Sequence, residues 1–91
     1  MEDIALHLKV GAEPIEVQPK NGRDFSLEEL KEFIGGGYVE AVWLHGEYEG
    51  FVLFVDEEGI LKNLPCNDIA SDLNDTFIAG DCLLCPSYMV K

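Results

Sequence analysis

The chain has 91 residues, of which 18 are acidic and 6 are basic, so its formal net charge is −12. This length predicts one domain over residues 1–91, because domains rarely fall below about 50 residues. The charge argues against direct contact with nucleic acid, whose phosphates attract lysine and arginine. Hydrophobic residues make up 47% of the chain, which favours a folded core over an acidic disordered segment.

The start of the chain predicts a cytoplasmic protein. Met1-Glu2-Asp3 is acidic, whereas a secretory signal peptide begins with positive charge. No apolar run approaches the roughly 20 residues that a membrane-spanning helix needs. We therefore expect no membrane contact.

Two short antiparallel strands are predicted first. Apolar residues alternate with others over residues 4–10 and again over residues 15–18, the period of a strand with one buried face. Pro19 and the turn-forming Asn21-Gly22 end the second strand.

A helix over residues 26–34 has the clearest local signal. Ser26, followed three residues later by Glu29, forms a capping box. Four apolar residues then share one helical face: Leu27, Leu30, Phe33 and Ile34. The glycines at 35–37 end the helix, because glycine adopts the left-handed conformation of a C-terminal cap without a side-chain clash.

Three strands are predicted next. Residues 38–44 and 51–55 are apolar on both faces, so we expect two central strands. Asp56-Glu57-Glu58-Gly59 predicts a hairpin loop with Gly59 at positive φ, from which residues 60–62 return as the third strand.

A second helix and a last strand complete the prediction. Asn67 caps a short helix over residues 68–73, and residues 77–85 form a long strand before Pro86. The order is ββαβββαβ with hairpin-length connections. This predicts an α+β fold with a mainly antiparallel sheet and two short helices.

Three stretches resemble, in order, the signatures of a small domain-of-unknown-function family of phage, plasmid and other mobile-element proteins. They are the helix, glycine run and strand of residues 27–42, the Glu-Glu-Gly-x-Leu-Lys-x-Leu-Pro run of residues 57–65, and residues 78–84. The resemblance implies no settled activity, and it offers no catalytic residue to carry over.

The cysteines invite a metal or redox interpretation, with Cys82 and Cys85 three residues apart and Cys66, His7 and His45 as further ligands. Residues three apart on a strand point to opposite faces. We therefore expect Cys82 and Cys85 to be core residues, with no metal and no cofactor. Cys66 has no recognisable base, and Asp68 opposes its activation, so we expect no catalytic residue and no enzyme.

Two acidic loops flank the predicted strand 51–55, and no lysine or arginine occurs from residue 32 to residue 61. Their carboxylates are Glu47, Glu49, Asp56, Glu57 and Glu58. A strand of this length holds the loops roughly 17 Å apart. That spacing favours an acidic edge over a two-carboxylate active site, whose carboxylates lie within about 5–10 Å.

These features predict a non-enzymatic binding protein of a phage or mobile element that uses the five carboxylates to engage a basic host protein. The partner would be a nucleic-acid-handling defence or regulatory factor, and the chain a partial DNA mimic or one half of a homodimeric mimic. A simpler alternative is a solvated acidic surface that maintains solubility. Another is a small-molecule or nucleotide-sequestering module, whose anion site would lie near Lys20 and Arg23.

Overall fold

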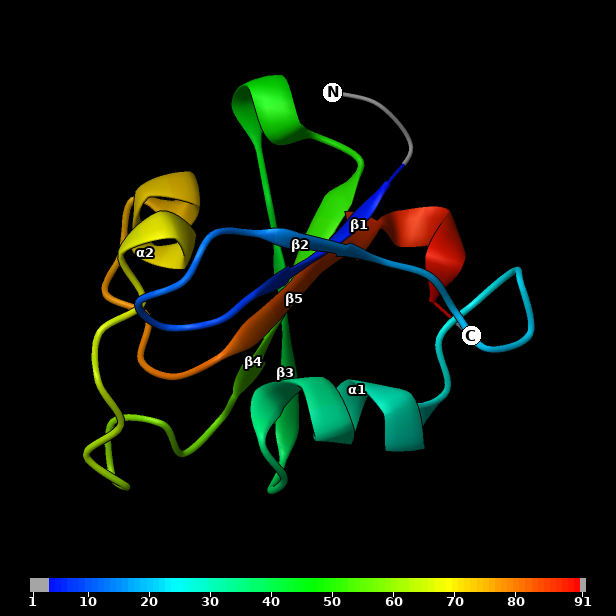
Figure 1. Ribbon diagram of the computed structural model, residues 1–91. Helices are drawn as coiled ribbons and strands as arrows, with labels where there is room; N and C mark the ends of the chain where they lie inside the picture. Colours follow the sequence, from blue (N-terminus) through cyan, green and yellow to red (C-terminus); the bar gives the residue numbers. More distant parts are fainter. Residues whose placement is uncertain (1–3, 91) are drawn as a thin grey trace.

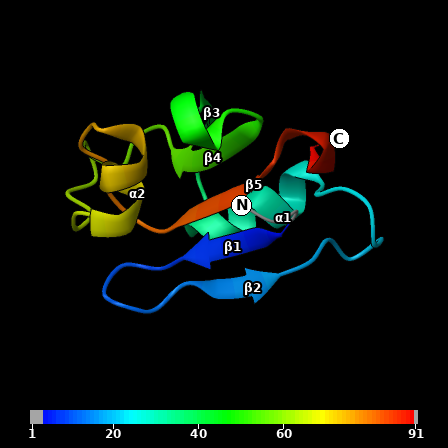
Figure 2. The same ribbon diagram turned by 90° about the horizontal axis from the view of Figure 1, so that it is seen from above.

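The computed structural model describes residues 4–90 and contains one five-stranded antiparallel sheet with the strand order β2-β1-β5-β4-β3, seen side by side in Figure 2. The strands are β1 (Ala5–Leu8), β2 (Ile15–Val17), β3 (Val39–Trp43), β4 (Phe51–Asp56) and β5 (Cys82–Pro86). Two α-helices and two 3₁₀ turns join them (Figure 1): α1 (Leu27–Ile34), α2 (Asp68–Asn74), η1 (Gly46–Tyr48) and η2 (Ser87–Met89). The predicted α+β class, antiparallel sheet and two short helices are confirmed. The acidic Met1-Glu2-Asp3 segment lies outside the described residues.

Two of the three inner strands, β4 and β5, are buried along their whole length. Because alternate side chains of a strand point to opposite faces, they build two separate cores. Leu53 and Leu84 pack in the same cluster as Ala70 of α2, on one face. Phe54 and Leu83 pack in the same cluster as Leu30 of α1, on the other. The two helices therefore cover opposite faces of the sheet.

β1 has cover on both of its faces. Ala5 and Leu8 are buried, and they belong to the two different clusters. The predicted single buried face is wrong, because the clusters that include α1 and α2 cover opposite faces of β1.

The capping box of α1 is confirmed. The Ser26 hydroxyl accepts the N–H of Glu29 at 3.2 Å, and the Glu29 carboxylate accepts the N–H of Ser26 at 3.0 Å and of Lys20 at 2.9 Å. These backbone donors, Ser26 first, lower the pKa of Glu29. Gly35 ends the helix at a φ of 89°, as predicted. Leu27 is 59% exposed, so its predicted burial is wrong and the buried stripe runs from Leu30 to Ile34.

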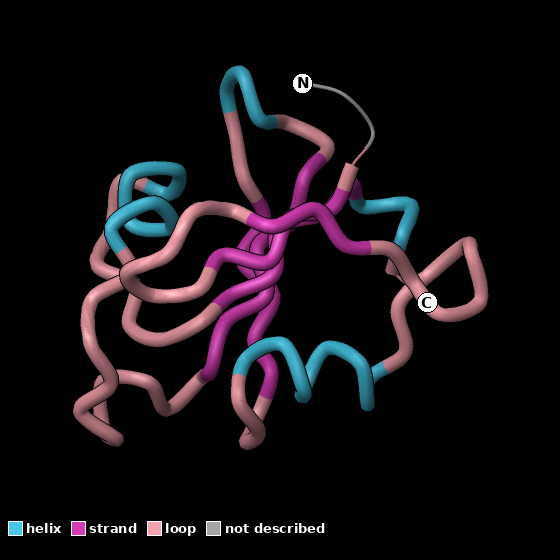
Figure 3. The backbone as a smooth tube through the Cα atoms, in the orientation of Figure 1, coloured by secondary structure: helices cyan, strands magenta, loops and turns pink. Residues whose placement is uncertain are grey.

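The predicted strand over residues 60–62 does not form, and Figure 3 shows this part of the chain as loop. The Lys62 N–H donates to the Glu58 carbonyl at 2.9 Å, which closes a turn where a hairpin was expected. The positive φ lies at Asn63, at 57°, and not at Gly59. β5, and not this segment, pairs with the other side of β4. β3 has β4 as its one partner among the described strands and lies at the edge of the sheet, so its predicted central position is also wrong.

The last strand is shorter than predicted, because Gly80 turns the chain just before it. Gly80 has a φ of 91°, and its N–H donates to the Pro65 carbonyl at 2.8 Å. Residues 77–81 contribute only an isolated bridge, between Ala79 and Cys66. The continuous strand therefore begins at Cys82.

A buried asparagine joins three parts of the fold. Asn67 is 2% exposed and caps α2 as predicted, its side-chain oxygen accepting the Ala70 N–H at 3.1 Å. Its side-chain nitrogen donates to the carbonyls of Leu8 at 2.8 Å and Gly80 at 2.9 Å. The end of β1, the turn before β5 and the start of α2 thus depend on one amide.

Replacing this amide tests its role. We expect Asn67→Ala to lower the free energy of unfolding by about 2 kcal/mol or more, because α2 loses its cap and two interior carbonyls lose a donor. Urea unfolding followed by circular dichroism measures the change. Asn74→Ala, at the last position of α2, is the control and should change stability by less than about 0.5 kcal/mol. Equal effects of the two substitutions would contradict the assigned role.

Candidate functional site

The five predicted partner-binding carboxylates lie at the two opposite ends of β4. Glu47 and Glu49 are exposed in and after η1, at the end where β4 begins. At the other end Glu57 is exposed and Glu58 is half-buried. The two loops therefore do not form one compact cluster.

Asp56 is not available to a partner. Its side chain is 2% exposed, and its carboxylate accepts the Lys62 ammonium at 2.8 Å and the N–H of Glu58 at 2.8 Å. The hydrogen bond from Lys62 to Asp56 raises the pKa of Lys62. A carboxylate removed from water needs such partners, because its unpaired burial is costly. Asp56 therefore drops out of the predicted binding surface and joins the internal framework.

Helix α2 adds carboxylates to those of η1. Tyr48, between Glu47 and Glu49, packs against the same hydrophobic cluster as Leu73 of α2. Asp72 and Asp75 flank Leu73 and are exposed. We call the exposed carboxylates within two residues of Tyr48 and Leu73 in the sequence the acidic face: Glu47, Glu49, Asp72 and Asp75.

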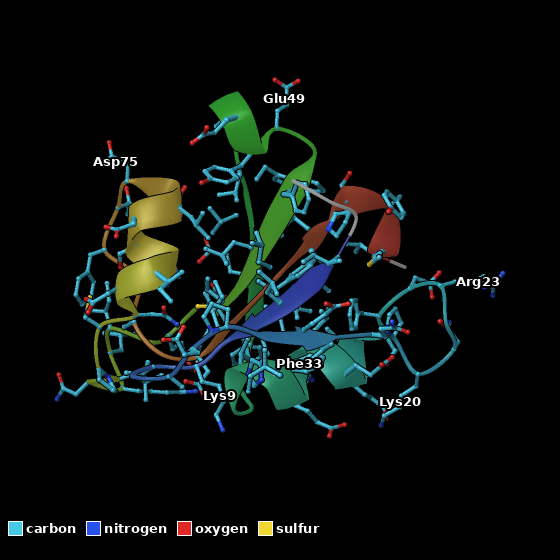
Figure 4. The ribbon with its side chains drawn as sticks, turned by 45° about the horizontal axis from the view of Figure 1, so that its top comes forward. Lys9, Lys20, Arg23, Phe33, Glu49 and Asp75 are labelled. Atoms are coloured by element: carbon cyan, nitrogen blue, oxygen red, sulfur yellow. The ribbon has the colours of Figure 1, made fainter. Side chains whose placement is uncertain are left out.

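Three of the six basic residues are seen apart from the labelled residues of the acidic face. In Figure 4, Glu49 and Asp75 point outward from the upper part of the molecule, whereas Lys9, Lys20 and Arg23 lie along its lower and right-hand parts. Two other places combine both signs of charge, at the Lys20–Glu32 and Lys62–Asp56 pairs. A basic surface that approaches the acidic face meets carboxylates from two different elements.

The predicted anion site is not assembled. Lys20 lies beside two carboxylates: its ammonium is 3.7 Å from Glu32, and its backbone N–H donates to Glu29. Both carboxylates also line the adjacent hollow of about 270 Å³. Arg23 points away from Lys20 (Figure 4). Negative charge around Lys20 opposes phosphate binding at this position.

A second hollow, of about 300 Å³, lies where the three family-like stretches meet. Its lining includes Gly35 after α1, the ion-paired Asp56 and Lys62, and Gly80 with Asp81 before β5. The Asp81 carboxylate accepts the Val10 N–H at 2.9 Å. No sequence pattern indicated this hollow, because its residues come from distant parts of the chain.

A glycine that lines this hollow has a packing role. A Cβ atom at Gly80 would lie 2.8 Å from the Leu64 side chain, closer than real Cβ atoms come to other atoms. A Cβ atom at Gly37 would meet the Lys62 ammonium, but that group is the end of a flexible side chain and can move aside. Two of the stretches that carry the family resemblance, residues 57–65 and 78–84, therefore pack closely at Leu64 and Gly80.

The cysteines lie as predicted. Cys82 and Cys85 are buried in the two opposite clusters, and burial raises the pKa of each thiol to about 12. Cys66 is exposed, with its sulfur 3.5 Å from the Asp68 carboxylate. Among residues 4–90, no three His, Cys, Asp or Glu side chains are grouped to hold a metal ion.

Comparison with known proteins identifies the family. Residues 1–88 match the family described as a domain of unknown function, DUF3846, and the chain belongs to it. No curated protein and no solved structure gives a significant match. Within residues 4–90, no helix has both the length and the apolar character that crossing a bilayer would require.

Removing the partner of Asp56 tests the internal ion pair. We expect Lys62→Met to lower the midpoint of thermal unfolding by several degrees, because the buried carboxylate keeps only one N–H donor. Lys9→Met, at an exposed position, is the matched control and should have little effect.

The loss of stability caused by Lys62→Met should depend on pH. The pKa of Lys62 is raised in the folded chain above its ordinary value of 10.5, so its stabilising contribution is complete below that value and is lost as the pH rises through the raised pKa. The stability difference between wild type and Lys62→Met should therefore shrink above pH 10.5. A difference that stays constant through this range, measured by denaturant unfolding, would argue against the ion pair.

Proposed function

We propose that this chain is a non-enzymatic binding protein that engages a basic host protein through its acidic face. The observation that carries the proposal is that Glu47, Glu49, Asp72 and Asp75 are exposed on or beside two elements that pack against one hydrophobic cluster. The basic side chains labelled in Figure 4 lie elsewhere. Glu57 and Glu58, at the far end of β4, add to the negative field at longer range. A net charge of −12 favours fast, steered association with a positive surface.

The resemblance to phage, plasmid and other mobile-element proteins supports a setting for this activity. We propose that the chain acts in the cytoplasm of a host cell, on a nucleic-acid-handling defence or regulatory factor. Proteins of that class carry basic surfaces, because they bind a polyanion. A compact acidic chain can compete for such a surface.

Charge density limits how closely the chain imitates DNA. Its longest extent is 33 Å, over which duplex DNA carries about 19 phosphate charges at one per 1.7 Å. The acidic face has four carboxylates. We therefore propose a partial mimic, in which charge steers the encounter and other contacts supply the affinity.

Charge reversal tests the acidic face. We expect the quadruple variant Glu47→Lys, Glu49→Lys, Asp72→Lys and Asp75→Lys to lose basic proteins that the wild-type chain captures from host lysate. Capture by the wild type should also weaken at high salt, because salt screens exposed charges. Affinity purification at low and high salt, with quantitative mass spectrometry, measures both effects.

The control variant reverses four exposed carboxylates outside the acidic face: Glu13→Lys, Glu16→Lys, Glu28→Lys and Glu32→Lys. It has the same net charge as the acidic-face variant and should keep its partners. If both variants lose their captured partners equally, only the total charge of the chain matters. If neither variant loses its partners, the acidic face has no part in binding.

A second candidate function is the binding of a small molecule, and the hollow of about 300 Å³ at the Asp56–Lys62 pair favours it. The Asp81 carboxylate, together with the carbonyl end of α1, suits a ligand with a positive amino group better than a phosphate. A nucleotide would instead use Lys20 and Arg23, against the opposition of Glu29 and Glu32.

A thermal-shift panel separates these candidates. The protein-binding proposal expects no stabilisation by ATP, ADP, cyclic nucleotides or spermidine. Stabilisation by spermidine that disappears in Asp81→Asn would support a ligand in the hollow. Stabilisation by a nucleotide that disappears in the double variant Lys20→Ala, Arg23→Ala would support the predicted anion site at these two residues.

A further inference from the structure

The outer edge of β3 presents backbone groups for another strand. The Leu44 N–H donates to the Phe51 carbonyl, and the Glu57 N–H donates to the Tyr38 carbonyl. Because directly opposed residues of antiparallel strands alternate between bonded and non-bonded pairs, the even-numbered residues of β3 bond to β4. The N–H and carbonyl groups of Val39, Ala41 and Trp43 therefore point away from β4. Within residues 4–90, no strand pairs with them.

The two edges of the sheet differ in their protection. β2, at the opposite edge, has three residues and lies between Pro14 and Pro19. Short length and flanking prolines are usual protections of an exposed edge. β3 has five residues and no proline, and its neighbour Tyr38 and its last residue Trp43 are 65% and 55% exposed. Exposed aromatic residues are enriched in protein interfaces.

A small groove lies beside this edge. Glu40 and Glu57 line it together with Ile60 and Phe77, and its volume is about 90 Å³. Glu40 shares its face of the sheet with the opposed residue Val55. The groove therefore combines two carboxylates with an apolar wall, which suits the aliphatic stem and charged head of one lysine or arginine.

We propose that β3 accepts an extended basic segment of a partner protein as a sixth strand of the sheet. The partner backbone pairs with Val39, Ala41 and Trp43, and its basic side chains lie on the face of Glu40, with one entering the groove. Apolar residues of the segment, on the other face, cover Ala41 and Trp43. This mode is strand addition, in which the backbone gives affinity and alternate side chains give specificity.

Charge selects this occupant over a second copy of the chain. Two copies paired antiparallel about Ala41 would bring their Glu40 carboxylates onto the same face as diagonal neighbours, where like charges repel. Each copy also carries a net charge of −12. A basic segment instead neutralises Glu40 and Glu57.

The proposal extends the proposed function with a second contact, and it rests on that function in requiring a basic partner. Its test uses a defined probe, a short blocked peptide in which valine and lysine alternate. We expect the peptide to shift the amide resonances of β3 in nuclear magnetic resonance titrations of the whole chain. We take the added strand as antiparallel to β3, so that the bonded residues of the peptide lie directly opposite Val39, Ala41 and Trp43. The valine amides then face β3 and the lysine amides face away.

Methylating the peptide nitrogens gives a matched pair of probes. Methylation of two valine amides removes two backbone bonds and should raise the dissociation constant about tenfold or more. Methylation of two lysine amides, on the outer edge, should have a much smaller effect. Equal effects of the two methylations, or shifts at the acidic face without shifts at β3, would overturn the proposal.

Two substitutions test the protein side. Ala41→Pro removes an outward N–H while leaving the β3–β4 bonds, and it should abolish binding of the peptide. Glu40→Lys should weaken binding of the lysine peptide and allow binding of a peptide in which valine alternates with glutamate. Concentration-dependent dimerisation through β3, detected by analytical ultracentrifugation, would assign the edge to a second copy instead.

The peptide test and the charge-reversal test fail independently. The acidic-face variant retains Glu40 and Glu57, so we expect it to bind the peptide even where it loses lysate partners. If Ala41→Pro loses peptide binding and the acidic-face variant still captures its lysate partners, strand addition at β3 is supported and binding through the acidic face is contradicted. If Ala41→Pro still binds the peptide and the acidic-face variant loses its lysate partners, only binding through the acidic face is supported.

Discussion

The burial of β4 and β5 on both faces is the constraint on which the rest of the structure depends. Apolar residues point to both sides of these strands, so the chain must supply cover twice, with α1 on one face and α2 on the other. The segment that follows β4 turns back instead of extending the sheet. β3 pairs with β4 alone among the described strands and lies at the edge. The elements η1 and α2 pack against one hydrophobic cluster and carry carboxylates that are remote in sequence.

One carboxylate in this acidic chain has a different role from its neighbours. Asp56 and Glu57 are adjacent in sequence, yet Asp56 is held inside by Lys62 and the Glu58 N–H, whereas Glu57 is exposed beside the edge groove. The cost of burying an unpaired charge explains why the lysine of this loop is placed at Asp56. The ion pair in turn fixes the turn that replaces the expected strand.

The two proposed contact regions would act at different ranges. The acidic face offers exposed charges, which act through the field they create and weaken with salt. The β3 edge offers directional backbone groups and exposed aromatic side chains, which act only after contact. A basic partner with an extended segment would use both, being steered by the first and held in register by the second.

The sequence by itself determined the features that arise within a few residues of the chain. The Ser26–Glu29 capping box, the Asn67 cap and the opposite faces of Cys82 and Cys85 depend on local hydrogen bonds and on strand period, so they could be predicted. The strand order, the edge position of β3 and the packing of Tyr48 and Leu73 against one hydrophobic cluster could not be predicted. Only the tertiary structure decided these, because they depend on how distant segments compete to cover the same apolar strands.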